Sequence, residues 1–399
     1  MELLRDTILR FKHLYGCEPE FVVTAPGRVN LLGEHTDYND GFVLPIAIDK
    51  KIIVAVGKRS DSEVHIHAID MMQSVRTTLS DISFNTKTMW ANYPFGVIKT
   101  LEQFHYPVGG LNMCYRGTVP MGSGLSSSAA IEVACTVAFS RLYQHSISVY
   151  DIIRIAQQSE IGFVGVNCGI MDQFISVMGK NHHSVFLDCR SLEHKYIPCP
   201  KGYRLVICDT GIKRELARSE YNMRRQDCRD AVEYFTRIDP SIKSLRDVSI
   251  EMYHHEENKL TPVPRDRAKH VIMENVRVER GALALARGDI SEFGKLMIDS
   301  HISLRDLYDV SCVELDTFVD IAIECDGVYG ARMTGAGFGG CGICLVDEAH
   351  VDELVEHVRH EYQRVARRSL AIYVASIEDG ATIYDMTSLG MPVQVANQF

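Results

Sequence analysis

The first sixteen residues, MELLRDTILRFKHLYG, place charged side chains between apolar ones at helical spacing. Leu4, Ile8 and Phe11 recur three or four residues apart, which predicts an amphipathic helix. Because charges interrupt every apolar run, the segment does not have the uninterrupted apolar stretch of a signal peptide.

A sheet-rich region follows the helix, since short apolar and β-branched runs alternate with polar turns. The runs predict strands at residues 21–24, 42–48, 51–56 and 63–69. Residues 126–143 are apolar nearly all round, which is typical of a buried helix, and residues 151–162 predict another helix.

The pattern restarts after the proline-containing stretch 197–202, which suggests a domain boundary there. We therefore expect an N-terminal domain over residues 1–200 and a C-terminal domain over residues 201–399. In the second half we expect strands at 203–208, 341–346 and 371–376, and helices at 219–238, 267–287, 291–306 and 351–362. Strands and helices mix without strict βαβ alternation, which favours the α+β class.

The composition narrows the choice of partners. Among 399 residues, 42 Lys and Arg face 52 Asp and Glu, a formal net charge of −10. A mildly acidic surface repels nucleic acid and anionic membranes, so we expect neither as a partner. The 12 cysteines are scattered, which is typical of buried thiols in a reducing compartment. No apolar run approaches the ~18 residues of a membrane span, and we expect a cytoplasmic protein.

The segment 120–130, PMGSGLSSSAA, runs directly into the buried helix. Free N–H groups at a helix start attract anions, and Gly122 and Gly124 let the main chain approach a phosphate closely. The hydroxyls of Ser126, Ser127 and Ser128 can cap the helix or hold a metal ion. A plain serine-capped helix is the simpler alternative.

The segment 25–38, APGRVNLLGEHTDY, concentrates Arg28, Glu34, His35 and Asp37 around a short apolar stretch. An unpaired buried charge is costly, so this density indicates mutual pairing or a shared polar ligand such as a sugar. An exposed, solvated loop is the alternative. Asp172, in the apolar string CGIMDQF, is either a structural hydrogen-bond acceptor or a base.

Several common motifs are excluded. The string Gly335 to Gly340, GAGFGG, matches a dinucleotide-binding pattern, but it leads into a strand where a helix is required. The sequence contains no Walker P-loop and no G-x-S-x-G nucleophile elbow.

Three segments together resemble the signatures of the GHMP small-molecule kinases: APGRVNLLGEHTDYNDG, PMGSGLSSSAAIEVA and MTGAGFGGCGICLV. The first, followed later by GIMDQFIS and SEYNMRR, is similar to the galactokinase group of that family. The matches run in the family's order from Ala25 to about Val346.

This resemblance implies a two-lobed α+β fold, with a ribosomal-S5-like N-terminal lobe, a ferredoxin-like C-terminal lobe and the active site between them. It implies that ATP phosphorylates the C1 hydroxyl of galactose, with Mg²⁺ as cofactor, giving α-D-galactose 1-phosphate and ADP. Galactose and ATP would be the partners, and the protein would be a monomer or a weak homo-oligomer.

The resemblance also assigns roles to residues. Asp172 would be the catalytic base and Arg28 its cationic partner, and Ser128 and Glu160 would hold Mg²⁺. The phosphates would lie against Gly122, Ser123, Gly124, Leu125, Ser126, Ser127 and Ser128. The sugar would contact Glu34, His35, Thr36, Asp37, Gly169 and Tyr221.

Two alternatives stay open within the resemblance. A related kinase could act on N-acetylgalactosamine, arabinose or a uronic acid, although the uninterrupted GEHTDYN favours galactose. A non-catalytic galactose sensor of the same fold would lack residues within GLSSSA, which is unbroken here.

The sequence departs from the family pattern at two positions. Ala336 replaces a glycine of MTGGGFGG, which is tolerable only if its φ is negative. Arg214 replaces a histidine near Tyr221. Trp90, the only tryptophan, is either close to the nucleotide base or a core residue.

Overall fold

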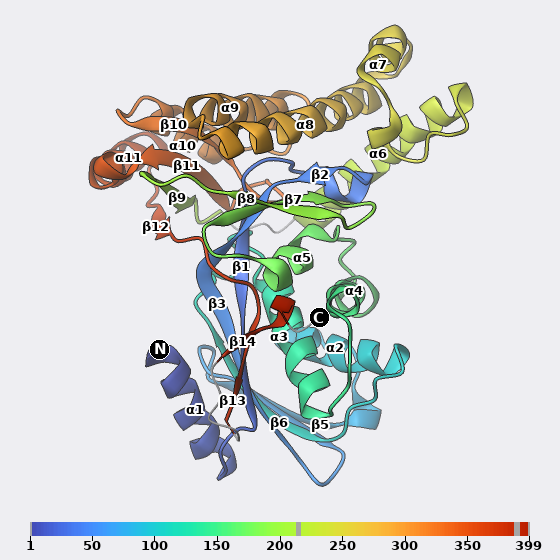
Figure 1. Ribbon diagram of the computed structural model, residues 1–399, viewed down its shortest axis with the longest axis vertical. Coiled ribbons are helices and arrows are strands. Elements are labelled where there is room, and N and C mark those ends of the chain that lie inside the picture. The colour runs from blue at the N-terminus through green and yellow to red at the C-terminus, as the bar shows by residue number, and fades with distance from the viewer. Residues whose placement is uncertain (1, 213–216, 387–391, 398–399) are drawn as a thin grey trace.

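The structure is a computed structural model that describes residues 2–212, 217–386 and 392–397. Within these ranges the strands form three sheets. Figure 1 shows the largest sheet in the lower half of the molecule and a smaller sheet beneath long helices in the upper half. A three-stranded sheet lies between them.

The largest sheet has the strand order β14-β13-β1-β3-β6-β4-β5 among the described residues. Its strands are β1 (Phe21–Asn30), β3 (Pro45–Lys58), β4 (Glu63–Ala68), β5 (Gln73–Thr78), β6 (Leu111–Gly117), β13 (Thr382–Asp385) and β14 (Val393–Gln394). Strands β4 and β6 pair in parallel, and the other described neighbours pair antiparallel. The predicted sheet-rich start is confirmed.

Strand β1 is longer than the sequence predicts. We expected a strand that ends at residue 24, but pairing with β3 continues to Asn30, with a register shift between Pro26 and Arg28. The predicted separation of strands 42–48 and 51–56 is also wrong. Apart from the short β2 (Phe42–Val43), both runs belong to β3. The extension places Arg28 on a paired strand, opposite Ala47 of β3.

Helices cover both faces of the large sheet. The predicted N-terminal helix, α1 (Glu2–Tyr15), packs through Leu4 and Phe11 against Val22 on one face. Val23 belongs to the core on the opposite face, as the period of two along a strand requires. Helices α3 (Ser127–Leu142) and α5 (Met171–Met178) pack on that face, and α2 (Asn92–Gln103) and α4 (Val149–Ser159) pack against these helices.

The second sheet is antiparallel, in the order β10-β11-β9-β12. Its strands are β9 (Tyr203–Asp209), β10 (Val328–Met333), β11 (Cys341–Asp347) and β12 (Ala371–Ala375). Helices α10 (Val313–Ile323) and α11 (Val351–Ala366) pack on the face that carries Val206 and Cys208. Helix α9 (Ile290–Asp306) packs on the other face. The expected α+β class is confirmed.

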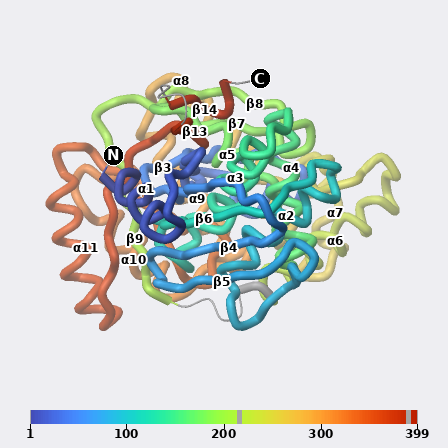
Figure 2. The backbone as a smooth tube through the Cα atoms, turned by 90° about the horizontal axis from the view of Figure 1, so that it is seen from below, coloured from blue at the N-terminus to red at the C-terminus, as the bar shows by residue number. Residues whose placement is uncertain are grey.

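The third sheet joins β2 to β7 (His183–Asp188) and β8 (His194–Pro198). Helix α8 (Pro262–Arg287) contacts β2 and β8. With α6 (Ala217–Ile238) and α7 (Ile250–Glu256) it surrounds a separate core that includes Phe235 and Tyr308. Helix α11 and the pair α6 and α7 lie at opposite ends of the molecule (Figure 2).

The end of the chain returns to the large sheet. Strands β13 and β14 follow the second sheet in sequence, but β13 pairs with β1. The division at residues 200 and 201 stays a prediction, and strand pairing places these two later strands in the first lobe. Among the described residues no helix is both long and apolar enough to cross a membrane.

Candidate active site

A cavity of about 1210 Å³ lies where the two lobes meet. Its wall includes Arg28 from β1, the loop before α3, Asp172 from α5, Tyr221 from α6 and the turn after β10. The three sequence segments that carry the predicted chemistry, more than 300 residues apart at their extremes, therefore contribute to one wall.

Arg28 and Asp172 form a bidentate ion pair in this wall. Arg28 Nε donates to Asp172 Oδ1 at 2.7 Å, and Nη2 donates to Oδ2 at 2.8 Å. The third nitrogen, Nη1, donates to the carbonyl of Gly124 at 2.5 Å. Burial would lower the pKa of Arg28, but the charges of Asp172 and Glu34 outweigh it and raise the pKa. Arg28 is therefore a permanent cation that joins the glycine loop to Asp172.

Ser126 points at the same carboxylate. Its Oγ donates to Asp172 Oδ2 at 2.5 Å, and its backbone is left-handed, with φ at 59°. Ser126 occupies the N-cap position of α3, yet its side chain makes no capping hydrogen bond. The serine-cap interpretation is therefore wrong for this residue, because the hydroxyl is used on the neighbouring acid.

The loop residues that we predicted to contact nucleotide fall into two groups, those that line the cavity and those that are buried beneath it. Gly122, Gly124, Ser126, Ser127 and Ser128 line the cavity. Ser123 is buried and its hydroxyl donates to the carbonyl of Pro120 at 2.8 Å, and Leu125 is buried in the core. Gly122 and Gly124 have φ of 75° and 84°, where glycine is favoured. The side chains of Ser123 and Leu125 thus support the loop from within.

Glu160 and Ser128, the two residues predicted to hold a metal, also line the cavity. Helix α4 passes into a π-helical turn at Glu160–Val164, a feature that is frequent at functional sites. Burial raises the pKa of Glu160, whereas a hydrogen bond from Ser128 opposes the rise. Gln173 Nε2 donates to Glu160 Oε2 at 2.8 Å.

These two oxygen donors fit Mg²⁺, which prefers hard oxygen ligands and is held by one or two carboxylates together with substrate phosphates and water. Among the described residues no group of three or more His, Cys, Asp or Glu side chains could hold a metal by itself. Ser128 and Glu160 fit the part of such a Mg²⁺ site that a protein supplies.

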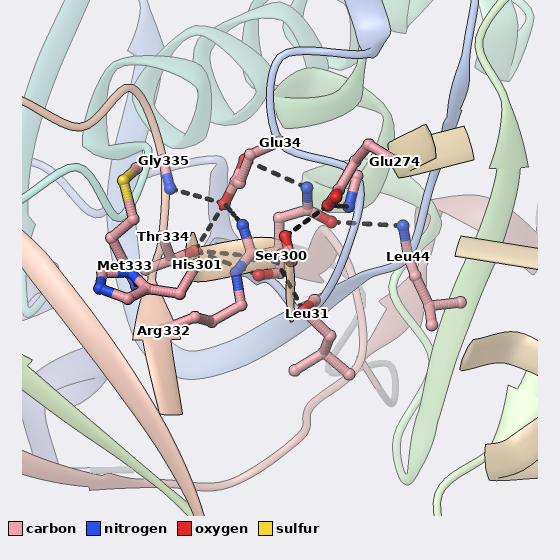
Figure 3. Close-up of polar contacts among 12 residues, drawn as sticks. Leu31, Glu34, Leu44, Glu274, Ser300, His301, Arg332, Met333, Thr334 and Gly335 are labelled. Carbon is pink, nitrogen blue, oxygen red and sulfur yellow. Dashed lines mark hydrogen bonds and ion pairs between the residues drawn. The ribbon is translucent and has the colours of Figure 1, made fainter. Parts of the chain in front are cut away.

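Glu34 also lines the cavity and is almost fully buried. Its Oε1 accepts from Thr334 Oγ1 at 2.9 Å and from the Gly335 N–H at 2.7 Å. Its Oε2 accepts from Asn30 Nδ2 at 3.1 Å. Figure 3 shows Glu34 with Thr334 and Gly335, and the buried Arg332 close to them.

His35 is a neutral, buried ring in the cavity wall. Burial, with the nearby His270 and arginines, lowers its pKa to about 3. Its Nδ1 is hydrogen bonded to Tyr38 Oη at 2.8 Å, and its ring lies 5.6 Å from that of Tyr221. His35 and Tyr221 thus form an uncharged, aromatic side of the site.

Asp37 shares its space with Gly169. A Cβ on residue 169 would lie 1.8 Å from Asp37 Oδ2. Burial, together with Asp172 and Glu34, raises the pKa of Asp37 to about 7, while Arg225 opposes the shift. Arg225 itself donates from Nη1 to the carbonyl of Asn167 at 2.6 Å.

Thr36 is the one predicted sugar contact whose side chain does not reach the cavity wall in the described residues. Its Oγ1 lies within hydrogen-bond distance of the Gly33 and Phe42 carbonyls. Ala336 lines the cavity and is absent from the residues with positive φ, so the condition for replacing a glycine is met. Arg214 lies outside the described residues.

Sequence reasoning missed part of the wall. Asp209 and Ile212 line the cavity, yet no motif marks them, and Asn222 lines it within SEYNMRR, where only Tyr221 was singled out. Trp90 is buried in the core cluster and also lines the cavity, which confirms the core interpretation, while its closeness to the nucleotide base stays a prediction. Arg225 stands in SEYNMRR, and the repeated basic residue after the predicted sugar tyrosine was the signal that could have identified it.

Comparison with protein families matches three parts of the chain. Residues 9–58 match the galactokinase galactose-binding signature, residues 92–180 the GHMP kinases N terminal domain, and residues 282–364 the GHMP kinases C terminal domain. Galactokinase from Roseiflexus sp. (strain RS-1) is 43% identical over 371 residues, covering 93% of this chain and 95% of the relative. Galactokinase from Clostridium beijerinckii is 42% identical over 375 residues, covering 93% and 96%.

Two solved structures are also similar to this chain. Lactococcus lactis galactokinase complexed with galactose superposes with a TM-score of 0.91 at 34% identity, covering 95% of this chain and 99% of that one. Methanococcus jannaschii mevalonate kinase, at 20% identity and a TM-score of 0.64 over 90% and 98% of the two chains, shares the fold. On this evidence the chain belongs to the galactokinase family of the GHMP kinases.

Proposed function

We propose that this chain transfers the γ-phosphoryl group of ATP to the C1 hydroxyl of D-galactose, giving α-D-galactose 1-phosphate and ADP. The observation that carries the proposal is the convergence of Arg28 and Ser126 on Asp172 beside the glycine loop. A carboxylate, a permanent cation and a phosphate-binding loop meet there at one point of the cavity. Phosphoryl transfer needs positioning and charge stabilisation above all.

Asp172 acts as the general base in this proposal. A carboxylate offers about four acceptor positions, and three are occupied by Arg28 Nε, Arg28 Nη2 and Ser126 Oγ. The remaining position, on Oδ1, accepts the proton of the sugar's C1 hydroxyl. The C1 oxygen then attacks the γ-phosphorus in line, and the bond between that phosphorus and the β,γ-bridging oxygen breaks to release ADP.

Arg28 has two effects on this step. Its guanidinium is the ion-pair partner of the Asp172 carboxylate, through two hydrogen bonds. Its Nη1 lies against the Gly124 carbonyl, so the cation also stands beside the loop where the transferred group gains negative charge. Its bidentate geometry fixes the base in one orientation.

Ser128 and Glu160 would hold Mg²⁺ in this proposal. When bound, the ion neutralises phosphate charge and aligns the γ-phosphoryl group. The backbone N–H groups around Gly122 and the start of α3 support the phosphates on the other side.

The nucleotide base fits the end of the cavity lined by Trp90, Tyr93 and Tyr115. Trp90 Nε1 donates to Gln73 Oε1 at 2.6 Å, which fixes the indole in the wall. Because the wall there is aromatic and apolar, it suits a flat heteroaromatic ring. Galactose occupies the opposite end, against Glu34, His35, Asp37, Gly169 and Tyr221.

The test is a coupled assay of ADP release with MgATP and a panel of sugars: galactose, N-acetylgalactosamine, arabinose and galacturonic acid. We expect the highest kcat/KM with galactose, and a product whose phosphate NMR signal is that of an α-anomeric phosphate. A higher kcat/KM with another sugar would contradict the substrate. Galactose binding without ADP release would instead support the sensor.

We also propose that the chain acts in the cytoplasm, as a monomer or a weak homo-oligomer. A mildly acidic surface and dispersed cysteines support this. Light scattering coupled to size exclusion, with and without galactose and MgATP, tests the oligomeric part, and a stable tetramer would contradict it.

A further inference from the structure

A buried arginine lies behind the sugar end of the cavity. Arg332, on β10 of the C-terminal lobe, has 0% of its surface exposed. Its Nη1 donates to the carbonyl of Leu31 at 2.8 Å, and its Nη2 lies 3.7 Å from Glu34 Oε1. Arg332 therefore contacts the backbone at Leu31, just after β1, and lies close to the carboxylate of Glu34, three residues further along the chain (Figure 3).

Two further groups of the same lobe bind the same carboxylate oxygen. The Thr334 hydroxyl and the Gly335 N–H both donate to Glu34 Oε1. With Asn30 on Oε2, three of about four acceptor positions are occupied by protein. The C-terminal lobe thus occupies Oε1 and leaves the free acceptor capacity on Oε2.

Arg332 is poorly explained as a stabilising residue alone. Its Nε and Nη2 make no hydrogen bond to any described residue, although buried donors are usually satisfied. A buried charge with unmet donors is costly unless its field acts on a partner. The negative charges that act on it are those of Glu34 and Glu274. Glu274 also contacts the segment that carries Glu34, since its Oε1 accepts from the Gly33 N–H at 2.9 Å.

We propose that Arg332 and Thr334 are positioning residues for sugar recognition: they hold the Glu34 carboxylate in one orientation, with Oε2 available to a sugar hydroxyl. Residues of the C-terminal lobe thereby set the orientation of Glu34, which lies in the N-terminal lobe. This proposal rests on the proposed function, specifically on Glu34 as a sugar ligand.

Steady-state kinetics of Arg332→Met and Thr334→Val test it, with KM measured separately for galactose and for ATP. We expect both variants to raise the galactose KM by about tenfold or more while the ATP KM changes by less than about twofold, because only the sugar end loses its fixed acceptor. Arg332→Lys should give an intermediate galactose KM, since an ammonium keeps the charge but has no planar fork of donors.

Arg246→Met is the control for loss of a partly buried ion pair outside the cavity wall. Arg246 pairs with Asp188 through both nitrogens of its fork and stacks on Phe42, away from the cavity wall. We expect a lower melting temperature and an unchanged galactose KM. If Arg332→Met and Thr334→Val behave like this control, with reduced stability and both KM values unchanged, the positioning role is wrong.

Glu34→Gln separates this proposal from the one on which it rests. An unchanged galactose KM in Glu34→Gln would overturn Glu34 as a sugar ligand, and the further inference with it. A raised galactose KM in Glu34→Gln, beside unchanged values in the other two variants, would overturn the positioning role alone. Should Arg332→Met fail to fold, Thr334→Val still decides, because it keeps the charge and shape of the cluster and removes only the hydrogen bonds of the Thr334 hydroxyl to Glu34 and to the Asn30 backbone.

Discussion

The carboxylate of Asp37 lies in the space that a side chain on residue 169 would fill. The Cβ of any residue other than glycine would stand 1.8 Å from Asp37 Oδ2, far inside van der Waals contact. Gly169 is therefore required by the position of an acid more than a hundred residues earlier, and the two segments are packed so that this acid lines the cavity.

Gly169→Ala should displace Asp37 and weaken sugar binding. We expect the galactose KM to rise by about tenfold or more, since a misplaced polar contact is costly in a fixed site. Gly162→Ala is the control, because nothing lies within 4 Å of a Cβ there. Similar galactose KM values in the two variants would contradict the steric argument.

Asp172→Asn should lose turnover and keep binding. Removing a general base costs about 10²–10⁴-fold in kcat, whereas the amide retains the shape of the carboxylate between Arg28 and Ser126. Single-turnover kinetics measure the loss, and calorimetry with galactose and with a nonhydrolysable ATP analogue measures binding. A kcat near that of the parent would eliminate Asp172 as the base.

Galactose binding should strengthen as pH rises through about 7. Asp37 has its pKa raised to about 7 by burial and by Asp172 and Glu34, with Arg225 opposing. Below that pH it is protonated and a poorer acceptor. Calorimetric titrations between pH 5.5 and pH 8.5 should show affinity increasing and then levelling, by about tenfold per unit in the steep region. Asp37→Asn should bind galactose more weakly at pH 8 and show a flat profile.

The same shift predicts the sign of a stability effect. The folded-state pKa of Asp37 exceeds its ordinary value of 3.8, so the folded protein holds the proton more tightly than the unfolded chain. This contribution to stability is complete below the unfolded pKa and is lost as pH rises toward about 7. Without ligands, Asp37→Asn should therefore have a higher melting temperature than the parent at pH 8. Equal melting temperatures at pH 8 would argue against the raised pKa.

Glu160→Gln should raise the Mg²⁺ concentration needed for activity. An amide oxygen is a weaker ligand than a carboxylate for a hard cation, and we expect the midpoint of a Mg²⁺ titration to rise by about tenfold or more, within the range for altered ligation. Binding of MgATP measured by calorimetry provides a readout apart from turnover. Glu102→Gln, on the exposed part of α2, is the control, and matching midpoints in both variants would remove Glu160 from the metal site.

The sequence by itself determined the secondary structure where periodicity is strong and the chemistry where residues cluster in short segments. The amphipathic α1, the buried α3 and the strands β9 and β11 follow from patterns that local burial imposes. The glycine loop and the acid-rich segment before Tyr38 stand out because unusual residue types recur within about a dozen positions, and the family resemblance then supplied their roles.

Tertiary structure alone decided how those segments meet. It extended β1 so that Arg28 reaches Asp172, and it turned Ser126 from a helix cap into a partner of that acid. It buried the Thr36 hydroxyl between backbone carbonyls, returned β13 to the first sheet, and placed Arg332 behind Glu34. Apart from the bonds of the Thr36 hydroxyl, which are local, each of these depends on a contact between residues distant in the chain. Neither local propensity nor motif spacing contains that information, because long-range packing sets it.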